Sequence, residues 1–156
     1  MIVLDGLMAK MEINSKTRKM TASGIGTSGR ICSIGSLLEI PPRFVSVERT
    51  TICITDCTFG VWDMETVRGL FSSDVDFVRL IFENIYIFCL KEKTIMMREI
   101  GSGSVSDAVR YIVKFCRDHG IPQLTHEQLA LLCSRSRPSV TNALHQLIRS
   151  EPEIFR

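Results

Sequence analysis

The pattern of apolar residues changes near Asp63, and this change limits the possible folds more than any other feature of the sequence. Before Asp63 the chain consists of short segments rich in β-branched and aromatic residues, separated by turn residues, as is typical of antiparallel strands. After Asp63 the apolar residues recur at helical spacing. The sequence therefore predicts an α+β chain in which a β half is followed by a helical half.

The strands of the β half are expected to be joined by tight turns. Asp5-Gly6 is a strong turn dipeptide, so residues 2–4 and 7–13 are predicted to form a hairpin. Residues 21–36 are dense in Gly, Ser and Thr, which favours tight turns over helix. Residues 50–62 then supply two strands around a further turn. The β half is therefore predicted to be antiparallel.

Helices are expected from Asp63 onwards. Asp63 is a suitable N-cap for a short helix over residues 63–71. Residues 74–100 then carry more apolar side chains than one exposed helix face usually holds, so this stretch is expected to pair with a second copy of the chain. The residues predicted to form the dimer interface are Ile81, Ile85, Phe88 and Ile95.

A break in the helical pattern divides the chain. Gly101-Ser102-Gly103-Ser104 has low helix propensity and is expected to form a hinge. The predicted domains are a β domain over residues 1–72, a dimerisation helix over 73–101 and a helical domain over 102–156.

Bulk composition excludes several classes of protein. With 45% hydrophobic and 23% charged residues the chain is expected to be globular, and a net charge of +2 is neutral evidence on nucleic acid. The N-terminus lacks a basic start followed by a long apolar run, so we expect a cytoplasmic protein without a signal peptide or membrane span. No nucleophile–base pair, paired carboxylates or phosphate-binding loop stands out, so an enzyme is not predicted.

Six cysteines are spread along the chain, and no pair has the C-x-x-C spacing of a zinc or thioredoxin-like site. We therefore expect them to be reduced, mostly buried apolar side chains, and we predict no metal and no cofactor. They are Cys32, Cys53, Cys57, Cys89, Cys116 and Cys133.

The last third of the chain carries clear helix starts. Ser106 is expected to cap a helix that ends near His119-Gly120. Thr125 and Gln128 form a capping box that begins a second helix. Ser136 is expected to begin a third, in which Pro138 is tolerated in the first turn. Two short helices around a turn of three or four residues are the arrangement by which a helix-turn-helix enters the major groove.

The third helix is predicted to be two-sided. Val140, Leu144 and Leu147 form an aliphatic inner face, and the outer face is polar. Side chains of this outer face and of the two caps are suited to base edges and phosphates, although a helical hairpin with a solvated face is the alternative. The candidate DNA-binding residues are Thr125, Ser136, Arg137, Ser139, Thr141, Asn142 and His145.

The residues Leu124-Thr125-x-Glu127-x-Leu129-Ala130 and Ser136-Arg137-x-x-Val140 resemble the helix-turn-helix of the CRP/FNR family of bacterial transcription regulators. Residues 2–7 resemble the family's apolar strand that ends in a glycine turn, Ile34-Gly35 its sensor-pocket glycine, and residues 55–70 its last strand and short helix. The resemblance implies a partial antiparallel β-roll of the cyclic-nucleotide-binding type, a double-stranded β-helix. It further implies a long dimerisation helix and a helix-turn-helix domain with little or no wing, in a chain shortened at both ends.

The resemblance also assigns roles to residues of the third helix. Arg137 matches the family's base- and phosphate-contacting arginine, and Ser139 a phosphate-contacting position. Pro138 stands where many members have glutamate and Asn142 where many have a second arginine. The implied target is a palindromic operator in double-stranded DNA that differs from the site of the cyclic-AMP receptor, because Asn142 would prefer adenine.

The sensor residues depart from the cyclic-nucleotide pattern. Ser36 follows Gly35 where those proteins carry a ribose-binding glutamate, and the phosphate-binding arginine has no match. We therefore expect a small effector other than cyclic AMP, with neither an iron–sulfur cluster nor haem. The candidate effector residues are Gly35, Ser36, Leu37, Arg43 and Arg49.

The predicted function is that of a dimeric, DNA-binding transcription regulator, with the effector and RNA polymerase as further partners. The alternative is a dimerising interaction protein, or a decayed regulator, that no longer binds DNA usefully.

Overall fold

The computed structural model describes residues 1–32, 48–88 and 93–155 of the chain. The strands are β1 (Ile2–Asp5), β2 (Met8–Ile13), β3 (Met20–Gly26), β4 (Glu48–Cys53) and β5 (Thr58–Gly60). The α-helices are α1 (Met64–Ser73), α2 (Val75–Tyr86), α3 (Lys93–Met96), α4 (Val105–Asp118), α5 (His126–Cys133) and α6 (Arg137–Ser150). A π-helical segment, η4 (Met97–Ser102), follows α3, and a 3₁₀ turn, η5 (Pro152–Phe155), follows α6.

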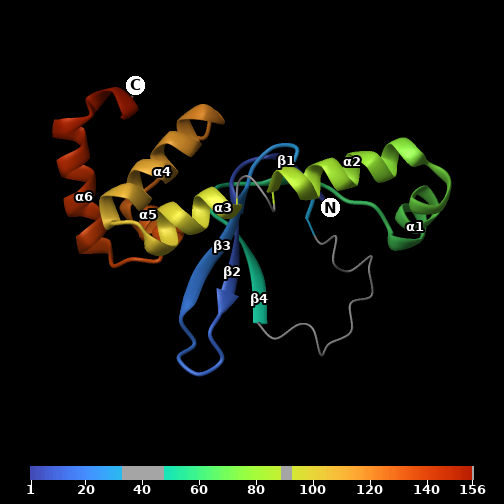
Figure 1. Ribbon diagram of the computed structural model, residues 1–156, viewed down its shortest axis with the longest axis horizontal. Coiled ribbons are helices and arrows are strands. Elements are labelled where there is room, and N and C mark those ends of the chain that lie inside the picture. The colour runs from blue at the N-terminus through green and yellow to red at the C-terminus, as the bar shows by residue number, and fades with distance from the viewer. Residues whose placement is uncertain (33–47, 89–92, 156) are drawn as a thin grey trace.

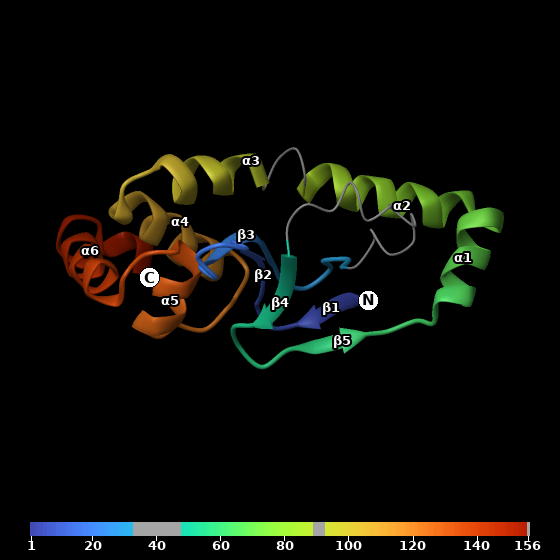
Figure 2. The ribbon, with the colours of Figure 1, turned by 90° about the horizontal axis from the view of Figure 1, so that it is seen from below.

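The elements form an elongated α+β molecule, as predicted for the fold class. The helices α4, α5 and α6 lie at one end and α1 at the other, with the strands between them (Figure 1). Seen from below, α2 and α3 lie one after the other along one side (Figure 2). Helices α2 and α3 thus both lie along the length of the molecule, α2 toward the α1 end and α3 toward the end formed by α4, α5 and α6 (Figure 2).

The strands form two antiparallel sheets, and their pairing corrects the predicted hairpin. β2 lies between β3 and β4, whereas β1 pairs with β5. Asp5-Gly6 is therefore the point where the chain passes from one sheet to the other. Gly6 has a φ of +90°, and a Cβ there would lie 2.1 Å from the carbonyl oxygen of Asp56. The glycine is needed for this close approach, and β4 and β5 likewise pair with other strands rather than with each other.

The glycine-rich stretch beginning at residue 21 was also predicted incorrectly, because its first part is strand β3. A Cβ on Gly24 would lie 2.7 Å from Cζ of Phe88, so the ring occupies the space where a side chain would be. Glycine within a strand here marks a close packing contact. The turn of this hairpin lies further back, where the Asn14 Oδ1 accepts hydrogen bonds from the backbone N–H groups of Lys16 and Thr17, at 3.0 and 2.9 Å.

The helix starts follow local capping signals. Asp63 caps α1 as predicted, its Oδ1 accepting from the backbone N–H of Thr66 at 2.7 Å. The prediction for α4 was displaced by two residues, because Ser104 is the N-cap and forms a capping box with Asp107. The helical segment before it also continues past Gly101 as far as Ser102. The break between the helices is therefore shorter than the predicted hinge.

An ion-pair cluster joins α4 to the end of α6. The Arg110 guanidinium contacts the carboxylate of Asp107 at 2.6 Å and donates three hydrogen bonds to the carboxylate of Glu151, the shortest at 2.7 Å. Hydrogen bonding to Arg110 lowers the pKa of Glu151. The contact holds the C-terminal end of α6 against α4.

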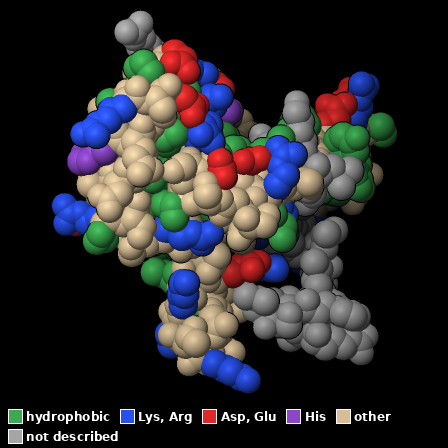
Figure 3. Space-filling model, turned by 60° about the vertical axis from the view of Figure 1, so that its left-hand side comes forward, with side chains coloured by type: hydrophobic (Ala, Val, Ile, Leu, Met, Phe, Trp, Pro, Cys, Tyr) green, Lys and Arg blue, Asp and Glu red, His purple; other side chains and the backbone are tan. Residues whose placement is uncertain are grey.

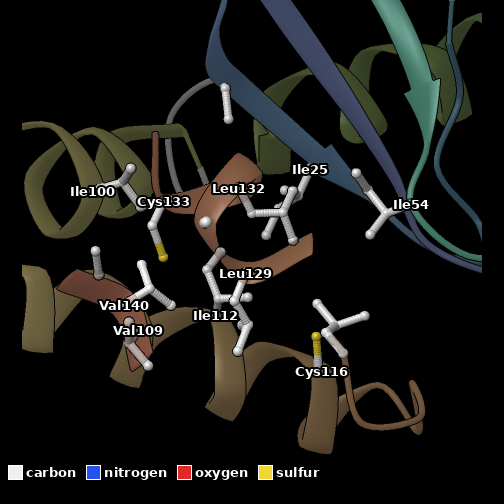
Figure 4. Packing of buried hydrophobic residues seen from close by; sticks show 14 of the residues in the cluster. Ile25, Ile54, Ile100, Val109, Ile112, Cys116, Leu129, Leu132, Cys133 and Val140 are labelled. Atoms are coloured by element: carbon white, nitrogen blue, oxygen red, sulfur yellow. The ribbon is translucent and has the colours of Figure 1, made fainter. Parts of the chain in front are cut away.

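One hydrophobic core contains residues of both the sheet and the helices. Leu7, Met11 and Ile25 of the β half belong to the same buried cluster as side chains of α4, α5 and α6 (Figure 4). Among the helical members Ile112, Leu132 and Val140 are fully buried. The β half and the helical end therefore pack together as one body.

The cysteines only partly match expectation. Cys116 and Cys133 are buried, Cys32 and Cys57 are half-buried, and Cys53 is exposed. Cys89 lies outside the described residues. Within the described ranges, no helix has the length and apolar character needed to cross a bilayer.

Candidate nucleic-acid interface

Helices α5 and α6 form a pair joined by the short turn Ser134–Ser136. The capping box predicted at the start of α5 is present, with Thr125 and Gln128 bonded in both directions. Ser136 caps α6 as predicted, and Pro138 lies in the first turn. Ser134 adopts the left-handed conformation, with φ 53° and ψ 38°. A non-glycine residue in this conformation costs roughly 1 kcal/mol, and the Ser134 Oγ accepts a hydrogen bond from Ala22 N at 3.0 Å that helps to offset it.

The two faces of α6 differ as the sequence predicts. Val140, Leu144 and Leu147 are buried on the inner face. On the outer face the side chains are exposed except that of Thr141, which is half-buried and bonded to His126 Nδ1 at 2.9 Å. The exposed candidate residues of α6 and its cap are Ser136, Arg137, Ser139, Asn142 and His145.

Some candidate hydroxyls already serve the fold. The Ser136 Oγ lies 2.8 Å from the Ser139 Oγ and accepts from the Ser139 backbone N–H. The Thr125 Oγ1 accepts from the Gln128 backbone N–H at 3.2 Å. These three residues stabilise the helix starts, and this leaves Arg137, Asn142 and His145 as the exposed candidate residues that are not used for capping.

Arg137 has a partner that the sequence analysis did not identify. Its Nη1 lies 3.4 Å from the Glu127 Oε1, and the two side chains are 64% and 75% exposed. An ion pair this exposed contributes about 0–1 kcal/mol. Arg137 can therefore leave Glu127 for an external anion at little cost.

Three hydrogen bonds hold the helix pair against the rest of the chain. The Gln128 Nε2 donates to the carbonyl oxygen of Ile54, just after β4. Ser134 is bonded to Ala22 of β3, and Arg135 Nη2 donates to the carbonyl oxygen of Ile100 at 3.1 Å. The orientation of α6 is therefore set partly by the sheet and by η4.

The surface around α6 carries basic side chains. Figure 3 shows Lys, Arg and His side chains distributed over this end of the molecule, with Asp and Glu side chains among them, and the β2–β3 hairpin extending below it with further Lys and Arg. Arg149 in the last turn of α6 is also exposed. A surface of this kind is compatible with the phosphate backbone of DNA.

The predicted dimer residues are only partly accessible. Ile81 is 4% exposed within a single subunit, so it has little surface left for a partner. Ile85, Phe88 and Ile95 are half-buried. The Arg30 guanidinium lies 3.2 Å from the centroid of the Phe88 ring, so part of that ring is covered from within its own chain.

The apolar side chains that α2 exposes are not the ones that were predicted to form the dimer interface. Val75 is 83%, Phe82 64% and Tyr86 63% exposed, and their spacing of seven and four residues places them on one side of the helix. Leu80 and Ile87, 54% and 50% exposed, lie on a neighbouring side.

Of the predicted effector residues, Gly35, Ser36, Leu37 and Arg43 lie outside the described residues. Arg49 is on β4, and its Nε lies 3.3 Å from the Glu12 Oε1 on the adjacent strand β2. Over residues 1–32, 48–88 and 93–155, no group of three or more His, Cys, Asp or Glu side chains is placed to hold a metal ion.

The fold places the chain in a known structural class. No protein-family model matches the sequence, and no curated protein matches it. Among solved structures, a CRP-family transcriptional regulator from Thermus thermophilus superposes with a TM-score of 0.72 at 15% identity, covering 96% of this chain and 74% of that one. A CRP/FNR-family regulator from Eubacterium rectale gives 0.68 at 13% identity, with 96% and 68% covered.

A third similar structure is the c-di-GMP-responsive global regulator CLP of Xanthomonas campestris, with a TM-score of 0.64 at 16% identity and coverage of 96% and 76%. The chain therefore has the fold of CRP/FNR-family transcription regulators over nearly its whole length, and the resemblance identified in the sequence is confirmed at this level.

Proposed function

We propose that this chain is a dimeric transcription regulator of the CRP/FNR type, in which α5 and α6 form a helix-turn-helix and α6 enters the major groove of DNA. The observation that carries the proposal is the two-sided α6, with exposed Arg137, Asn142 and His145 opposite a buried aliphatic face. The two small sheets then correspond to a partial β-roll, and the turn at Ser134 to the turn of the motif.

The remaining parts of the proposal come from the sequence. The effector is a small molecule other than cyclic AMP, because Ser36 stands where cyclic-nucleotide binders carry glutamate. DNA and RNA polymerase as partners place the protein in the cytoplasm. The predicted domains correspond to separate functions: residues 1–72 bind the effector, residues 73–101 form the dimer and residues 102–156 bind DNA.

The experiment that tests the proposal is binding selection on random duplexes. A two-fold symmetric dimer presents two copies of α6, so the selected sequences are expected to be palindromes whose half-sites lie roughly one helical turn apart. The selected duplex is then titrated with the protein, with a shuffled duplex of equal length as the control. If no palindrome is recovered, the proposal is contradicted and the alternative of a dimerising interaction protein is favoured. The exposed apolar side of α2 would still form the dimer interface of such a protein.

Homodimerisation through α2 is expected to be visible in solution. We propose an interface centred on Val75, Phe82 and Tyr86, to which the half-buried Ile85 and Phe88 add their remaining surface. Burying aromatic side chains supplies the apolar area that a stable interface needs. Sedimentation velocity at micromolar concentration is expected to show a dimer, and Phe82→Asp is expected to shift it to monomer.

Val61→Asp is the matched control for this prediction, because Val61 is 74% exposed but lies outside α2. It is expected to leave the dimer intact. A wild-type protein that is monomeric while its circular dichroism shows the full helical content would contradict the interface.

A further inference from the structure

Two cysteines at the two ends of the β4–β5 connection are not used by the proposed function. Cys53 is the last residue of β4 and is exposed, whereas Cys57 precedes β5 and is half-buried. Cys53 pairs with Met8 of β2, and the Cys57 Sγ lies 3.3 Å from the carbonyl oxygens of Leu7, the residue before Met8, and of Thr55. The fold therefore brings the two cysteines close together, which is the condition for bridging them without a large movement of the backbone.

The two thiols differ in their accessibility to solvent. Burial, assisted by the contact with Cys53, raises the pKa of the Cys57 thiol to about 11, so Cys57 stays protonated near neutral pH. Of the five cysteines that the structure describes, Cys53 is the exposed one and is the first of them that a dissolved oxidant meets. Cys116 and Cys133 are buried, and burial raises the pKa of Cys116 to about 11 and that of Cys133 to about 12, so a dissolved oxidant does not reach them before Cys53.

We propose that Cys53 and Cys57 form a reversible disulfide when the protein is exposed to a peroxide. The Cys53 thiolate attacks one peroxide oxygen, the O–O bond breaks, and the released hydroxide takes up the thiol proton to leave as water. The Cys57 sulfur then attacks the Cys53 sulfenic acid, the S–O bond breaks, and the second water leaves with the Cys57 proton. The net reaction consumes two thiols and one hydrogen peroxide and yields one disulfide and two waters.

The disulfide would constrain residues 53–57, a segment that is hydrogen-bonded to α5 of the α5–α6 pair. Ile54, between the two cysteines, is 7% exposed in the shared core, and its carbonyl oxygen accepts the hydrogen bond from Gln128 at the start of α5. Its backbone N–H donates to the Leu7 carbonyl oxygen at 2.8 Å. Closing a ring over residues 53–57 removes the Cys57 S–H donor and constrains Ile54. We therefore expect oxidation to weaken the contact between this loop and α5.

The covalent step does not depend on DNA binding, whereas its regulatory consequence rests on the proposed function. The full-length reduced protein is treated with hydrogen peroxide without denaturant and digested with trypsin and Asp-N. Trypsin releases residues 50–68 as one peptide, and cleavage before Asp56 and Asp63 separates the two cysteines. The expected product is residues 50–55 joined to 56–62, lighter than the two thiol peptides by two hydrogen atoms and separated again by dithiothreitol.

Three variants test the assignment. Cys57→Ser should stop at the Cys53 sulfenic acid, trapped by dimedone, and Cys53→Ser should leave Cys57 unmodified under the same conditions. Cys32→Ser, a half-buried cysteine elsewhere in the fold, should still form the 53–57 bridge. Wild-type protein that keeps both thiols, or that converts Cys53 to higher acids while Cys57 stays free, would overturn the disulfide.

Hydrogen exchange separates the two parts of the proposal. The amides of the first turn of α5 are expected to exchange faster in the oxidised protein, with recovery after dithiothreitol. Unchanged exchange would overturn the coupling to α5 even if the disulfide forms. Absence of DNA binding in both redox states would instead count against the proposed function and leave the disulfide standing.

Discussion

Arg137→Ala is expected to weaken specific DNA binding by about 1–3 kcal/mol, or about 5- to 150-fold, because it removes a charge-assisted contact to a base or phosphate. Arg137 lies at the start of α6 with its side chain 64% exposed, so its loss should not disturb the core. Preference should also relax at one base pair of each half-site. Titration of the selected duplex and of a shuffled duplex, both at the same salt concentration, measures the two effects.

Three further variants make this result specific. Asn142→Ala should relax preference at a different base pair, expected to be an adenine. Glu127→Gln should strengthen binding modestly, because it frees Arg137 and removes a negative charge near the phosphates. Leu144→Met changes the buried face of α6 and should leave specificity alone. Equal affinity of wild type and Arg137→Ala at low salt would contradict the placement of α6 in the groove.

The parts of this site that the sequence predicted depend on short-range signals. The caps at Asp63, Thr125 and Ser136 are set by a side chain and a backbone group three residues away, so the sequence alone contains both partners. The same holds for the buried face of α6, whose apolar residues recur at helical spacing. These features locate the candidate interface without any knowledge of the sheet.

The contacts that orient the site could not be predicted in this way. Gln128 reaches Ile54 across 74 positions, and Ser134 reaches Ala22 across 112. Each of the two residues also has a local role: Gln128 belongs to the capping box of α5, and Ser134 lies in the turn after α5. The second bond of each depends on how the sheet packs against α5, which no local pattern encodes.

Strand pairing could not be predicted for the same reason, and neither could the division of the apolar residues of α2 between buried and exposed. Asp5-Gly6 is a valid turn signal, yet Gly6 is required by the approach of Asp56 from far along the chain. On α2, helical spacing shows that apolar residues are in excess but not which of them the chain covers itself. Ile81 proves to be buried within the subunit, whereas its neighbour Phe82 is exposed.

Leu132→Ala is expected to destabilise the whole chain by about 2–5 kcal/mol, because it removes a fully buried side chain and leaves a cavity. Leu132 is on α5 and points toward the strand that carries Ile25, so it lies where the helices meet the sheet (Figure 4). Urea unfolding should be followed by far-ultraviolet circular dichroism, which reports the helices. Fluorescence of Trp62, the single tryptophan, follows the chain just after β5.

In the wild type the two signals should change together, because one buried cluster includes both halves and neither half can lose it alone. In Leu132→Ala both midpoints should fall by the same amount. Ile148→Ala is the matched control, since Ile148 is also on a helix of this end but is 46% exposed, and it should change stability by less than about 0.5 kcal/mol. A shift confined to the circular dichroism signal would mean that the helical end unfolds independently, and the bonds from Gln128 and Ser134 would then be the main connection between that end and the sheet.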